Sequence, residues 1–331
     1  PFETKKEYEL TYADKEREED ILADTFAVPL QPIKTFGSNG DGWTNKLIFG
    51  DNLQVLKTLM NAPEVKGKVR LIYIDPPFGT GDIYDARGEA PAYSAKLQGA
   101  KFIEFLRKRL VFLREILADD GSIYVRTDYH FGHYLKAVMD EIFGKNRFAG
   151  EITLKRLNAQ GAIMKSFCSA TESLYHYKMS DIAFFKPIPK KREKEPTWFP
   201  LNSPKENPHK KTIIIGGKVY TAPRGQHWMF SQEKADYYLK AGRIRIRNDK
   251  PEYLQSEAQS IDSNWTDIQG YTSRTRYPTE NSEQVLARAI EASSQKGDLV
   301  LDAFAGSGTT GAVAEKLGRR WIMIDCGKLA I

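Results

Sequence analysis

The sequence is short of the residues that build a disulfide framework, a metal site or a membrane span. It has only two cysteines, Cys168 and Cys326, which excludes a disulfide framework and a cysteine-rich zinc site. The five histidines include the close pair His130 and His133 but no H-E-x-x-H pattern, so we expect no metal site. No run approaches the ~20 apolar residues that cross a bilayer, and no signal peptide opens the sequence. We therefore expect a cytoplasmic protein with no membrane association.

Positive charge is concentrated in one stretch of the chain. The 331 residues, enough for about two domains, carry a net charge of +6. Residues 186–250 hold 16 Lys and Arg against 6 Asp and Glu, whereas the rest of the chain holds 33 against 37. A basic segment on a slightly acidic body suggests a module that binds a polyanion, and a solvated charged face is the alternative.

Strand-like and helix-like patterns alternate on both sides of this basic stretch. Apolar runs predict strands at 46–51, 69–74, 122–125, 150–157, 174–185, 299–303 and 321–325, and helical spacing predicts helices at 53–59, 102–117, 131–143, 282–294 and 309–317. The alternation predicts an α/β fold with a doubly wound, mostly parallel, Rossmann-like sheet. We expect a lead-in at 1–45, two halves of one sheet domain at 46–185 and 277–331, and an insertion at 186–276.

A glycine-rich turn follows the predicted strand that ends at Asp302. It contains Gly306, Gly308 and Gly311 and opens a helix, so backbone N–H groups can approach a ligand closely. Asp325 lies 19 residues after Gly306, a spacing that suits a carboxylate accepting both ribose hydroxyls of a nucleoside. No lysine follows Gly308, which excludes a P-loop. A dinucleotide and S-adenosyl-L-methionine (AdoMet) both remain candidates for this turn.

A second turn, Asp75-Pro76-Pro77-Phe78, follows the buried strand at 69–74. The prolines lack N–H groups, so the turn presents two acceptors, the carboxylate of Asp75 and the carbonyl of Pro76, beside an aromatic face. These groups suit the exocyclic amino group of a nucleobase, because two acceptors bind its N–H groups and free the nitrogen lone pair for attack. A base in a duplex must flip out to reach such a turn. A proline-rich turn with a capping aspartate is the alternative.

The order of these motifs resembles the amino-group DNA methyltransferases of the permuted β class, which modify adenine N6 or cytosine N4. The resemblance rests on D-P-P-F, a basic insertion, Tyr277 to Leu286 (Y-P-T-E-N-S-E-Q-V-L) and finally D-A-F-A-G-S-G-T-T from Asp302. In detail the chain is similar to the modification (Mod) subunits of type III restriction systems. The resemblance implies an AdoMet-dependent methyltransferase sheet with an inserted target-recognition region at 186–276. It also implies double-stranded DNA as partner, and leaves a homodimer and a nuclease subunit open.

The resemblance also assigns roles to individual residues. Asp75 and Pro76 would accept hydrogen bonds from the target amino group, Pro77 would belong to the same catalytic motif, and Phe78 would stack on the flipped base. The residues implied for AdoMet are Asp51, Asn52, Thr279, Ser282, Asp302, Phe304, Gly306, Gly308, Thr309, Thr310 and Asp325. Among them, Asp325 would hold the ribose, Asp302 would lie near the methionine part, and Thr279 and Ser282 would contact the methionine end. Asp51 and Asn52 would lie beside the adenine of the cofactor, and Asp51 is equally suited to cap a helix.

Two features depart from the family pattern. The family usually has a lysine after its Thr-Glu pair, and this sequence has Asn281 instead. The sequence also ends at Ile331, six residues after Asp325, although a doubly wound sheet would have a covering helix there. We therefore expect the chain to be truncated.

The basic insertion supplies the candidate DNA-binding residues. Lysine and arginine can neutralise phosphates, which gives affinity and salt dependence without sequence preference. Three arginines alternate and would share one face of a strand, lying either along a groove or in solvent. The candidates are Lys190, Lys191, Arg192, Lys194, Lys210, Lys211, Arg243, Arg245 and Arg247.

Adenine N6 is the expected target, because the catalytic motif begins with Asp and the cytosine-N4 members of the family more often have Ser. Cytosine N4 is the alternative within the same chemistry, and a DNA-binding specificity subunit without turnover is the alternative outside it. Methylation of cytosine C5 is disfavoured, because it needs a Pro-Cys nucleophile and neither cysteine follows a proline. A protein or RNA methyltransferase would usually have Asn-Pro-Pro, and a dehydrogenase would leave the D-P-P-F turn unexplained.

Overall fold

A computed structural model describes residues 8–35, 42–77, 99–156, 167, 169–205, 207–272 and 280–327. The chain divides into two compact units. We call residues 1–188 with 262–331 the sheet domain, and residues 189–261 the inserted domain.

The sheet domain is built on one mixed sheet. Over the described residues it has eight strands, with β3, β5 and β4 joined antiparallel and the other neighbours parallel. In spatial order they are β1 (Lys46–Phe49), β19 (Arg320–Asp325), β18 (Leu299–Asp302), β2 (Val69–Ile74), β3 (Leu117–Thr127), β5 (Thr171–Lys178), β4 (Phe148–Lys155) and β15 (Asn264–Gln269). A small antiparallel pair, β16 (Tyr271–Thr272) and β17 (Glu280–Asn281), lies outside this sheet.

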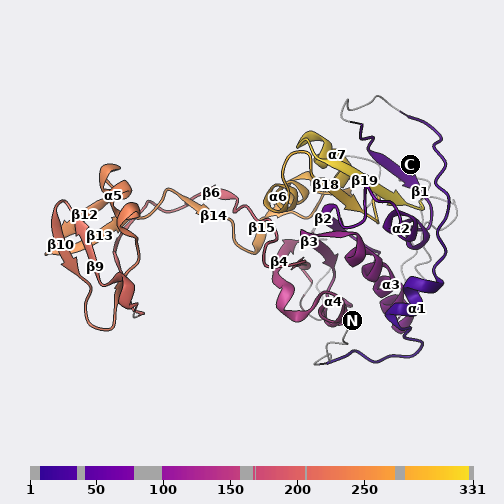
Figure 1. The fold of residues 1–331 in the computed structure, drawn as a ribbon, viewed down its shortest axis with the longest axis horizontal. Coiled ribbons are helices and arrows are strands. Elements are labelled where there is room, and N and C mark those ends of the chain that lie inside the picture. The colour runs from indigo at the N-terminus through magenta and orange to yellow at the C-terminus, as the bar shows by residue number, and fades with distance from the viewer. Residues whose placement is uncertain are drawn as a thin grey trace. The chain divides into compact units, whose positions relative to one another are not determined.

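The helices cover both faces of the sheet. They are α1 (Glu18–Asp24), α2 (Asn52–Met60), α3 (Ala100–Ile116), α4 (Gly132–Phe143), α6 (Glu283–Ser293) and α7 (Thr309–Lys316). The crossovers through α2 and α3 run across the sheet in the opposite direction to the crossover through α7, so a right-handed connection puts them on opposite faces. Figure 1 shows α6 and α7 on one side of β2 and β18, and α2 and α3 on the other.

Because helices cover both faces of the sheet, the central strands are apolar along nearly their whole length. Five of the six residues of β2 are buried, because helices lie over both of its faces. The same holds for β18, which is buried throughout. The predicted α/β fold with a doubly wound, mostly parallel, Rossmann-like sheet is confirmed. One strand was not anticipated, since β15 pairs parallel with β4 although it lies within the 186–276 stretch assigned to the insertion.

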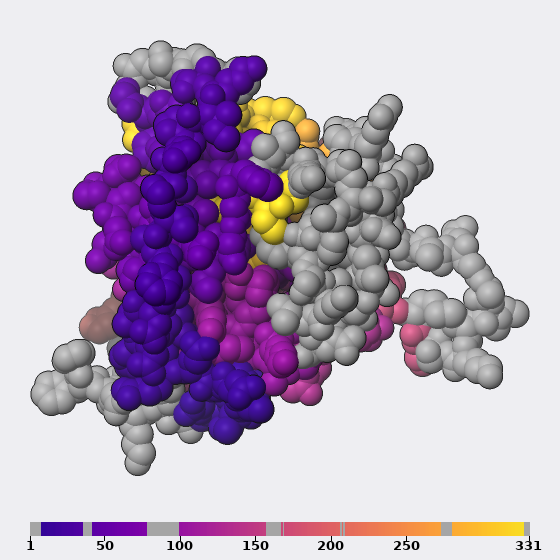
Figure 2. All heavy atoms as spheres, turned by 90° about the vertical axis from the view of Figure 1, so that its right-hand side faces the viewer, coloured from indigo at the N-terminus to yellow at the C-terminus, as the bar shows by residue number. Residues whose placement is uncertain are grey.

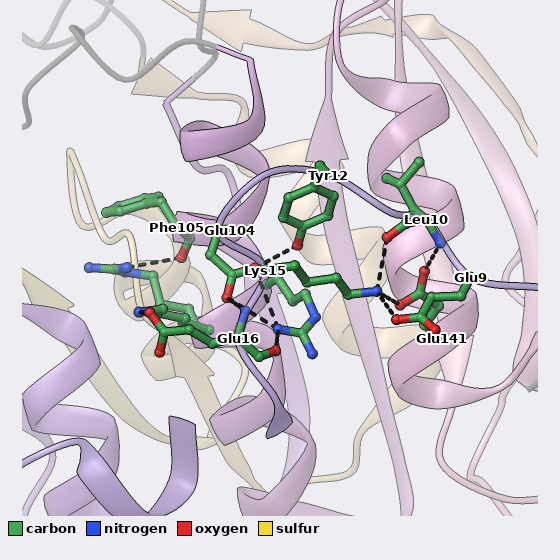
Figure 3. A network of polar contacts seen from close by, with 11 residues as sticks. Glu9, Leu10, Tyr12, Lys15, Glu16, Glu104, Phe105 and Glu141 are labelled. Atoms are coloured by element: carbon green, nitrogen blue, oxygen red, sulfur yellow. Dashed lines mark hydrogen bonds and ion pairs between the residues drawn. The ribbon is translucent and has the colours of Figure 1, made fainter. Parts of the chain in front are cut away.

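The described part of the acidic lead-in, residues 8–35, is tied to the outer helices by polar contacts. Figure 2 shows the indigo N-terminal segment running along one face of the sheet domain. Tyr12 donates to Glu104 on α3 at 2.5 Å, and the ammonium of Lys15 contacts Glu141 on α4 at 2.8 Å (Figure 3). Lys15 also donates to Glu9 at 2.7 Å and to the carbonyl of Leu10 at 2.9 Å. These contacts link the lead-in to two helices distant in sequence.

The inserted domain has its own hydrophobic core. Its elements are β6 (Pro189–Lys191), β7 (Trp198–Pro200), β8 (Asn202–Ser203), a 3-10 turn (Pro208–Lys210), β9 (Thr212–Ile215), β10 (Lys218–Thr221), β11 (His227–Trp228), α5 (Gln232–Lys240), β12 (Ile244–Arg247), β13 (Lys250–Leu254) and β14 (Ala258–Ser260). Trp228, Phe230 and Tyr220 are buried in the core, with α5 packed over it. A separate core is typical of a module that folds as its own unit.

Two tight hairpins shape this domain. Gly216 and Gly217 have φ of 59° and 81° between β9 and β10, and Asn248 and Asp249 have φ of 51° and 59° between β12 and β13. Two successive positive φ angles produce the turn twist that suits a two-residue hairpin, and glycine and asparagine tolerate them best.

The ion pair between Lys15 and Glu141 is nearly buried. Lys15→Met leaves the Glu141 carboxylate without its cation, and we expect this to lower the free energy of unfolding of the sheet domain by about 3 kcal/mol. Lys316→Met, which removes the exposed pair with Glu283, should cost under about 1 kcal/mol. Urea unfolding of the full chain measures both losses. Equal losses would contradict a structural role for the lead-in.

Candidate active site

Two loops meet at the carboxyl edge of the central sheet. Strands β2 and β18 are parallel neighbours, so the turn after Ile74 and the loop after Asp302 leave the sheet side by side. In open α/β sheets ligands bind at this edge, between such loops. The pairing therefore brings together the two motifs that the sequence carries 227 positions apart, at Asp75 and Asp302.

Asp75 is held from one side by an amide. Asn281, on β17, donates from its Nδ2 to Oδ2 of Asp75 at 2.9 Å, and Nη1 of Arg126 lies 4.0 Å from the same oxygen. Burial raises the pKa of Asp75 to about 6, and the negative charge of Glu172 acts in the same direction. The positive charge of Arg126 and the hydrogen bond from Asn281 oppose this rise. With a pKa of about 6, the carboxyl group of Asp75 is mostly ionised at neutral pH and takes up its proton on mild acidification.

The three neighbours of Asp75, namely Arg126, Glu172 and Asn281, were not predicted from the sequence to be functional residues. Arg126 directly follows the predicted strand residues 122–125 and lies near the end of β3. Glu172 lies on β5, the antiparallel neighbour of β3. A charged residue at the carboxyl end of a buried strand is the signal that could have singled out Arg126. Asn281 was noticed only as a departure from a family pattern.

The glycine loop needs backbone conformations that other residues adopt at a cost. Gly306 and Gly308 have φ of 50° and 73°, in the left-handed region. A Cβ on Gly311, in the first turn of α7, would lie 3.0 Å from Cγ of Met323, so either that side chain or the helix would have to shift by a few tenths of an ångström. The glycines thus bring the start of α7 close to the edge of the sheet.

Two buried carboxylates hold this loop in place. Asp325 accepts from the backbone N–H of Gly306 at 2.8 Å and of Gly327 at 2.7 Å. Asp302 accepts from the N–H of Phe304 at 2.9 Å and from the hydroxyl of Thr310 at 2.6 Å. Burial raises the pKa of Asp302 to about 7, although both of these hydrogen bonds lower it.

A third contact set joins α2 to the glycine loop. Asp51 caps α2 by accepting from the N–H of Leu53 at 2.9 Å, as the capping alternative predicted. Asn52 donates to the carbonyl of Ala303 at 2.7 Å and accepts from Nε of Arg109. Arg109 also bonds Asp51 at 3.0 Å, so one buried guanidinium fixes both residues beside the loop.

Comparison with known proteins identifies the fold's family. Residues 69–331 match the sequence profile of a family described as DNA methylase. The chain belongs to this family. This confirms the family drawn from the order of the motifs.

Proteins similar in sequence to this chain include members of restriction-modification systems. The type II methyltransferase M.EcaI of Enterobacter cloacae is 32% identical over 85% of this chain and 66% of its own length. A probable type III restriction-modification enzyme, the HindVI Mod subunit of Haemophilus influenzae, is 26% identical over 87% of this chain and 49% of its own. The chain thus spans between about half and two thirds of the length of these relatives.

A solved structure of the same fold is named PvuII DNA methyltransferase (cytosine-N4-specific). It aligns with a TM-score of 0.51 over 86% of this chain and 83% of that one, at 14% sequence identity. At this level of identity the likeness concerns the fold.

The other predicted site residues fall into two groups. Phe304, Thr309 and Thr310 are buried around the glycine loop, and Ser282 is buried at the start of α6, where its N–H donates to the carbonyl of Gly270 at 3.1 Å. Phe78 and Thr279 lie outside the described residues. Pro76 is buried and Pro77 half-buried directly after Asp75.

Several basic residues predicted to bind DNA are engaged within the inserted domain. Arg192 donates to the carbonyl of Ser256 at 2.7 Å, and Arg245 pairs with Glu252 at 2.7 Å over the ring of Trp198. Arg243 is half-buried and bonds the carbonyl of Gln255, so the three alternating arginines do not form one free face. Lys191, Lys194 and Arg247 are exposed. Lys190, Lys210 and Lys211 are half-buried.

Two absences concern the part of the chain that the structure describes. No group of three or more His, Cys, Asp and Glu side chains there could hold a metal ion. No helix in those segments is long and apolar enough to span a membrane.

The raised pKa of Asp302 predicts a pH-dependent stability. In the unfolded chain this carboxyl ionises above the ordinary aspartate pKa of 3.8, whereas in the fold it keeps its proton to about pH 7. Relative to Asp302→Asn, the wild-type protein should therefore lose stability as pH rises from about 4 to about 7, by up to ~1.36 kcal/mol per pH unit. Asparagine can accept from the N–H of Phe304 through its Oδ1 and donate from Nδ2 to the hydroxyl of Thr310, so it is the matched variant. A stability difference that is constant across this range, measured by urea unfolding, would contradict the assignment.

Proposed function

We propose that this protein transfers a methyl group from AdoMet to the exocyclic amino group of a base in DNA. The observation that carries the proposal is the side-by-side arrangement of an Asp-Pro-Pro turn and a glycine loop on two adjacent parallel strands. One loop offers acceptors for an amino group, and the other offers a close backbone approach to a nucleoside.

The chemistry of the glycine loop fits AdoMet. Residues 303–311 contain no lysine or arginine to balance a phosphate, and two buried carboxylates, Asp302 and Asp325, flank the loop. AdoMet has no phosphate and carries positive charge on its sulfonium and amino groups, so acidic surroundings favour it over a dinucleotide. Asp302, Phe304, Gly306, Gly308, Thr309, Thr310 and Asp325 would hold it, with Asp51, Asn52, Thr279 and Ser282 around them.

When bound, AdoMet would supply an electrophilic methyl group, whose bond to the sulfonium sulfur would break as the base nitrogen takes the methyl, leaving a neutral thioether. The contribution of Asp75 is to accept one N–H of the target amino group, while the carbonyl of Pro76 accepts the other. Two acceptors hold the nitrogen so that its lone pair points at the methyl carbon rather than into the ring. As that nitrogen gains positive charge, the ionised carboxylate of Asp75 stabilises it, and the surplus proton leaves to solvent.

DNA is the proposed substrate, and the inserted domain is the proposed target-recognition region. A base must leave the duplex to reach Asp75, and Phe78 is proposed to stack on it. The positive charge of residues 186–250 supports contact with phosphates. We further propose that the protein is the modification component of a restriction-modification system, and a homodimer or a nuclease partner stays a prediction.

Adenine N6 is the proposed target because the motif begins with Asp75, and cytosine N4 is the second candidate. The two amino groups offer the same chemistry, so a direct product analysis is needed. Incubation with methyl-labelled AdoMet and mixed genomic DNA, followed by nucleoside analysis, separates them. Label in N6-methyldeoxyadenosine supports the proposal, and label in N4-methyldeoxycytidine overturns the target alone. AdoMet binding without any label would favour a DNA-binding subunit that lacks turnover.

Asp75→Ala should reduce methyl transfer on the order of a thousandfold, because it removes the acceptor that stabilises charge on the nitrogen. AdoMet affinity, measured by calorimetry, should change less than about twofold, since Asp75 contacts the target rather than the cofactor. Asp302→Ala is the comparison, because it should weaken AdoMet binding. A parallel loss of cofactor binding and transfer in Asp75→Ala would make Asp75 structural.

The exposed lysines of the inserted domain should contribute to DNA affinity. Reversing Lys191 and Lys194 to Glu should weaken DNA binding and reduce the slope of log affinity against log salt by about 2, because each lysine releases counterions on binding phosphate. Lys66→Glu with Lys68→Glu makes the same charge change on an exposed part of the sheet domain. Equal effects of the two pairs would mean that net charge, not this surface, governs binding.

A further inference from the structure

A fully buried guanidinium lies behind the Asp-Pro-Pro turn. Arg126 extends from the carboxyl end of β3 and donates from Nε and Nη2 to one oxygen of Glu172, at 2.8 and 2.6 Å. Its Nη1 donates to the carbonyl of Gly270 at 3.0 Å, and its Cζ lies 3.7 Å from the ring centre of Tyr271. These contacts from two segments hold the guanidinium of Arg126 in place.

The same guanidinium fixes the orientation of the amide of Asn281. Nη1 of Arg126 also bonds Oδ1 of Asn281. A guanidinium has only donors, so the amide must turn its oxygen toward Arg126 and its NH₂ group toward Asp75. The resulting bond, from Nδ2 to Oδ2 of Asp75, is 2.9 Å long. The donors of Arg126 thus determine which group Asp75 meets.

This arrangement occupies one oxygen of Asp75. Among the described residues, no neighbour donates a hydrogen bond to Oδ1. We propose that Arg126 and Asn281 are positioning residues that hold Asp75 by Oδ2, so that Oδ1 is presented to the amino group of the target base. The proposal rests on the proposed function, and it adds two residues to the catalytic turn that act through Asp75.

The ionisation of Asp75 provides a readout of this arrangement. The groups that face its carboxylate come from several strands, namely Tyr73 on β2, Arg126 on β3, Glu172 on β5, Tyr271 on β16, Asn281 on β17 and Asp302 on β18. Arg126 and Asn281 favour the charged form, whereas burial and Glu172 favour the neutral form. Removing partners from the two sides should therefore move the pKa of Asp75 in opposite directions.

Two substitutions test the proposal. Asn281→Ala removes the donor to Oδ2 and should raise the pKa of Asp75 by roughly half a unit or more. Glu172→Gln keeps an acceptor for Arg126 but removes a negative charge, and should lower the pKa of Asp75. Asn264→Ala, which removes an exposed amide whose oxygen accepts from Thr266 at the start of β15, is the matched control and should leave the pKa of Asp75 unchanged.

The first measurement uses the full chain without AdoMet or DNA. A ¹³C carboxyl titration of labelled aspartates, with Asp75→Asn identifying the resonance, gives the pKa of Asp75 directly. The second measurement is the pH profile of kcat at saturating AdoMet on the DNA identified by product analysis. Its acid limb should shift up in Asn281→Ala and down in Glu172→Gln, while AdoMet affinity stays within about twofold of wild type.

A merely structural role predicts a different pattern. It would lower kcat equally at every pH and leave the Asp75 titration where it is in wild type, which would overturn the proposal. Shifts of both variants in the same direction would also overturn it. If the wild-type protein transfers no methyl group, the proposed function fails, and the carboxyl titration still decides whether Asn281, and Glu172 through its pair with Arg126, set the pKa of Asp75.

Discussion

The parallel pairing of β2 with β18 is the contact on which the rest of the candidate site depends. It joins residues 69–72 to residues 299–301, so two segments from opposite ends of the described chain leave the sheet at one edge. Neither loop can bring an amino-group acceptor and a nucleoside-binding turn together on its own. Because helices bury both faces of these strands, the register is fixed by a continuous apolar core, and the loops inherit their spacing from it.

Placing three carboxylates at this edge has an electrostatic cost, and the structure meets it in two ways. Asp302 and Asp325 accept hydrogen bonds from the backbone and from Thr310, which also fixes the glycine loop. Asp75 has a buried guanidinium nearby and a single amide bond. Burial raises the pKa values of Asp75 and Asp302, and neighbouring carboxylates raise them further, so the negative charge is only partly balanced within the fold. A ligand with positive charge would complete that balance.

The sequence was sufficient where a pattern is local. Continuous apolar runs predicted β2 and β18, and the motifs after them predicted which side chains reach the edge. Arg126 was not predicted as part of the site, because its partners come from strands that no local pattern links to it. The hairpins of the inserted domain were also missed, although Gly216–Gly217 between alternating apolar residues is a turn signal. Strand β15 pairs with β4 across more than a hundred residues, which spacing alone does not reveal.

The departure at Asn281 has a physical explanation in this network. The resembled family usually has a lysine at this position, and a lysine here would bring an ammonium against the buried guanidinium of Arg126. A lysine has only donors, so it could pair with Asp75 but could not accept from Nη1 of Arg126, and the two cations would repel each other within the buried cluster. A neutral amide instead accepts from Arg126 and donates to Asp75. The positive charge therefore comes from Arg126 on β3, and Asn281 on β17 provides the hydrogen bond that holds the carboxylate of Asp75. Asparagine at 281 and arginine at 126 are therefore best understood as one unit.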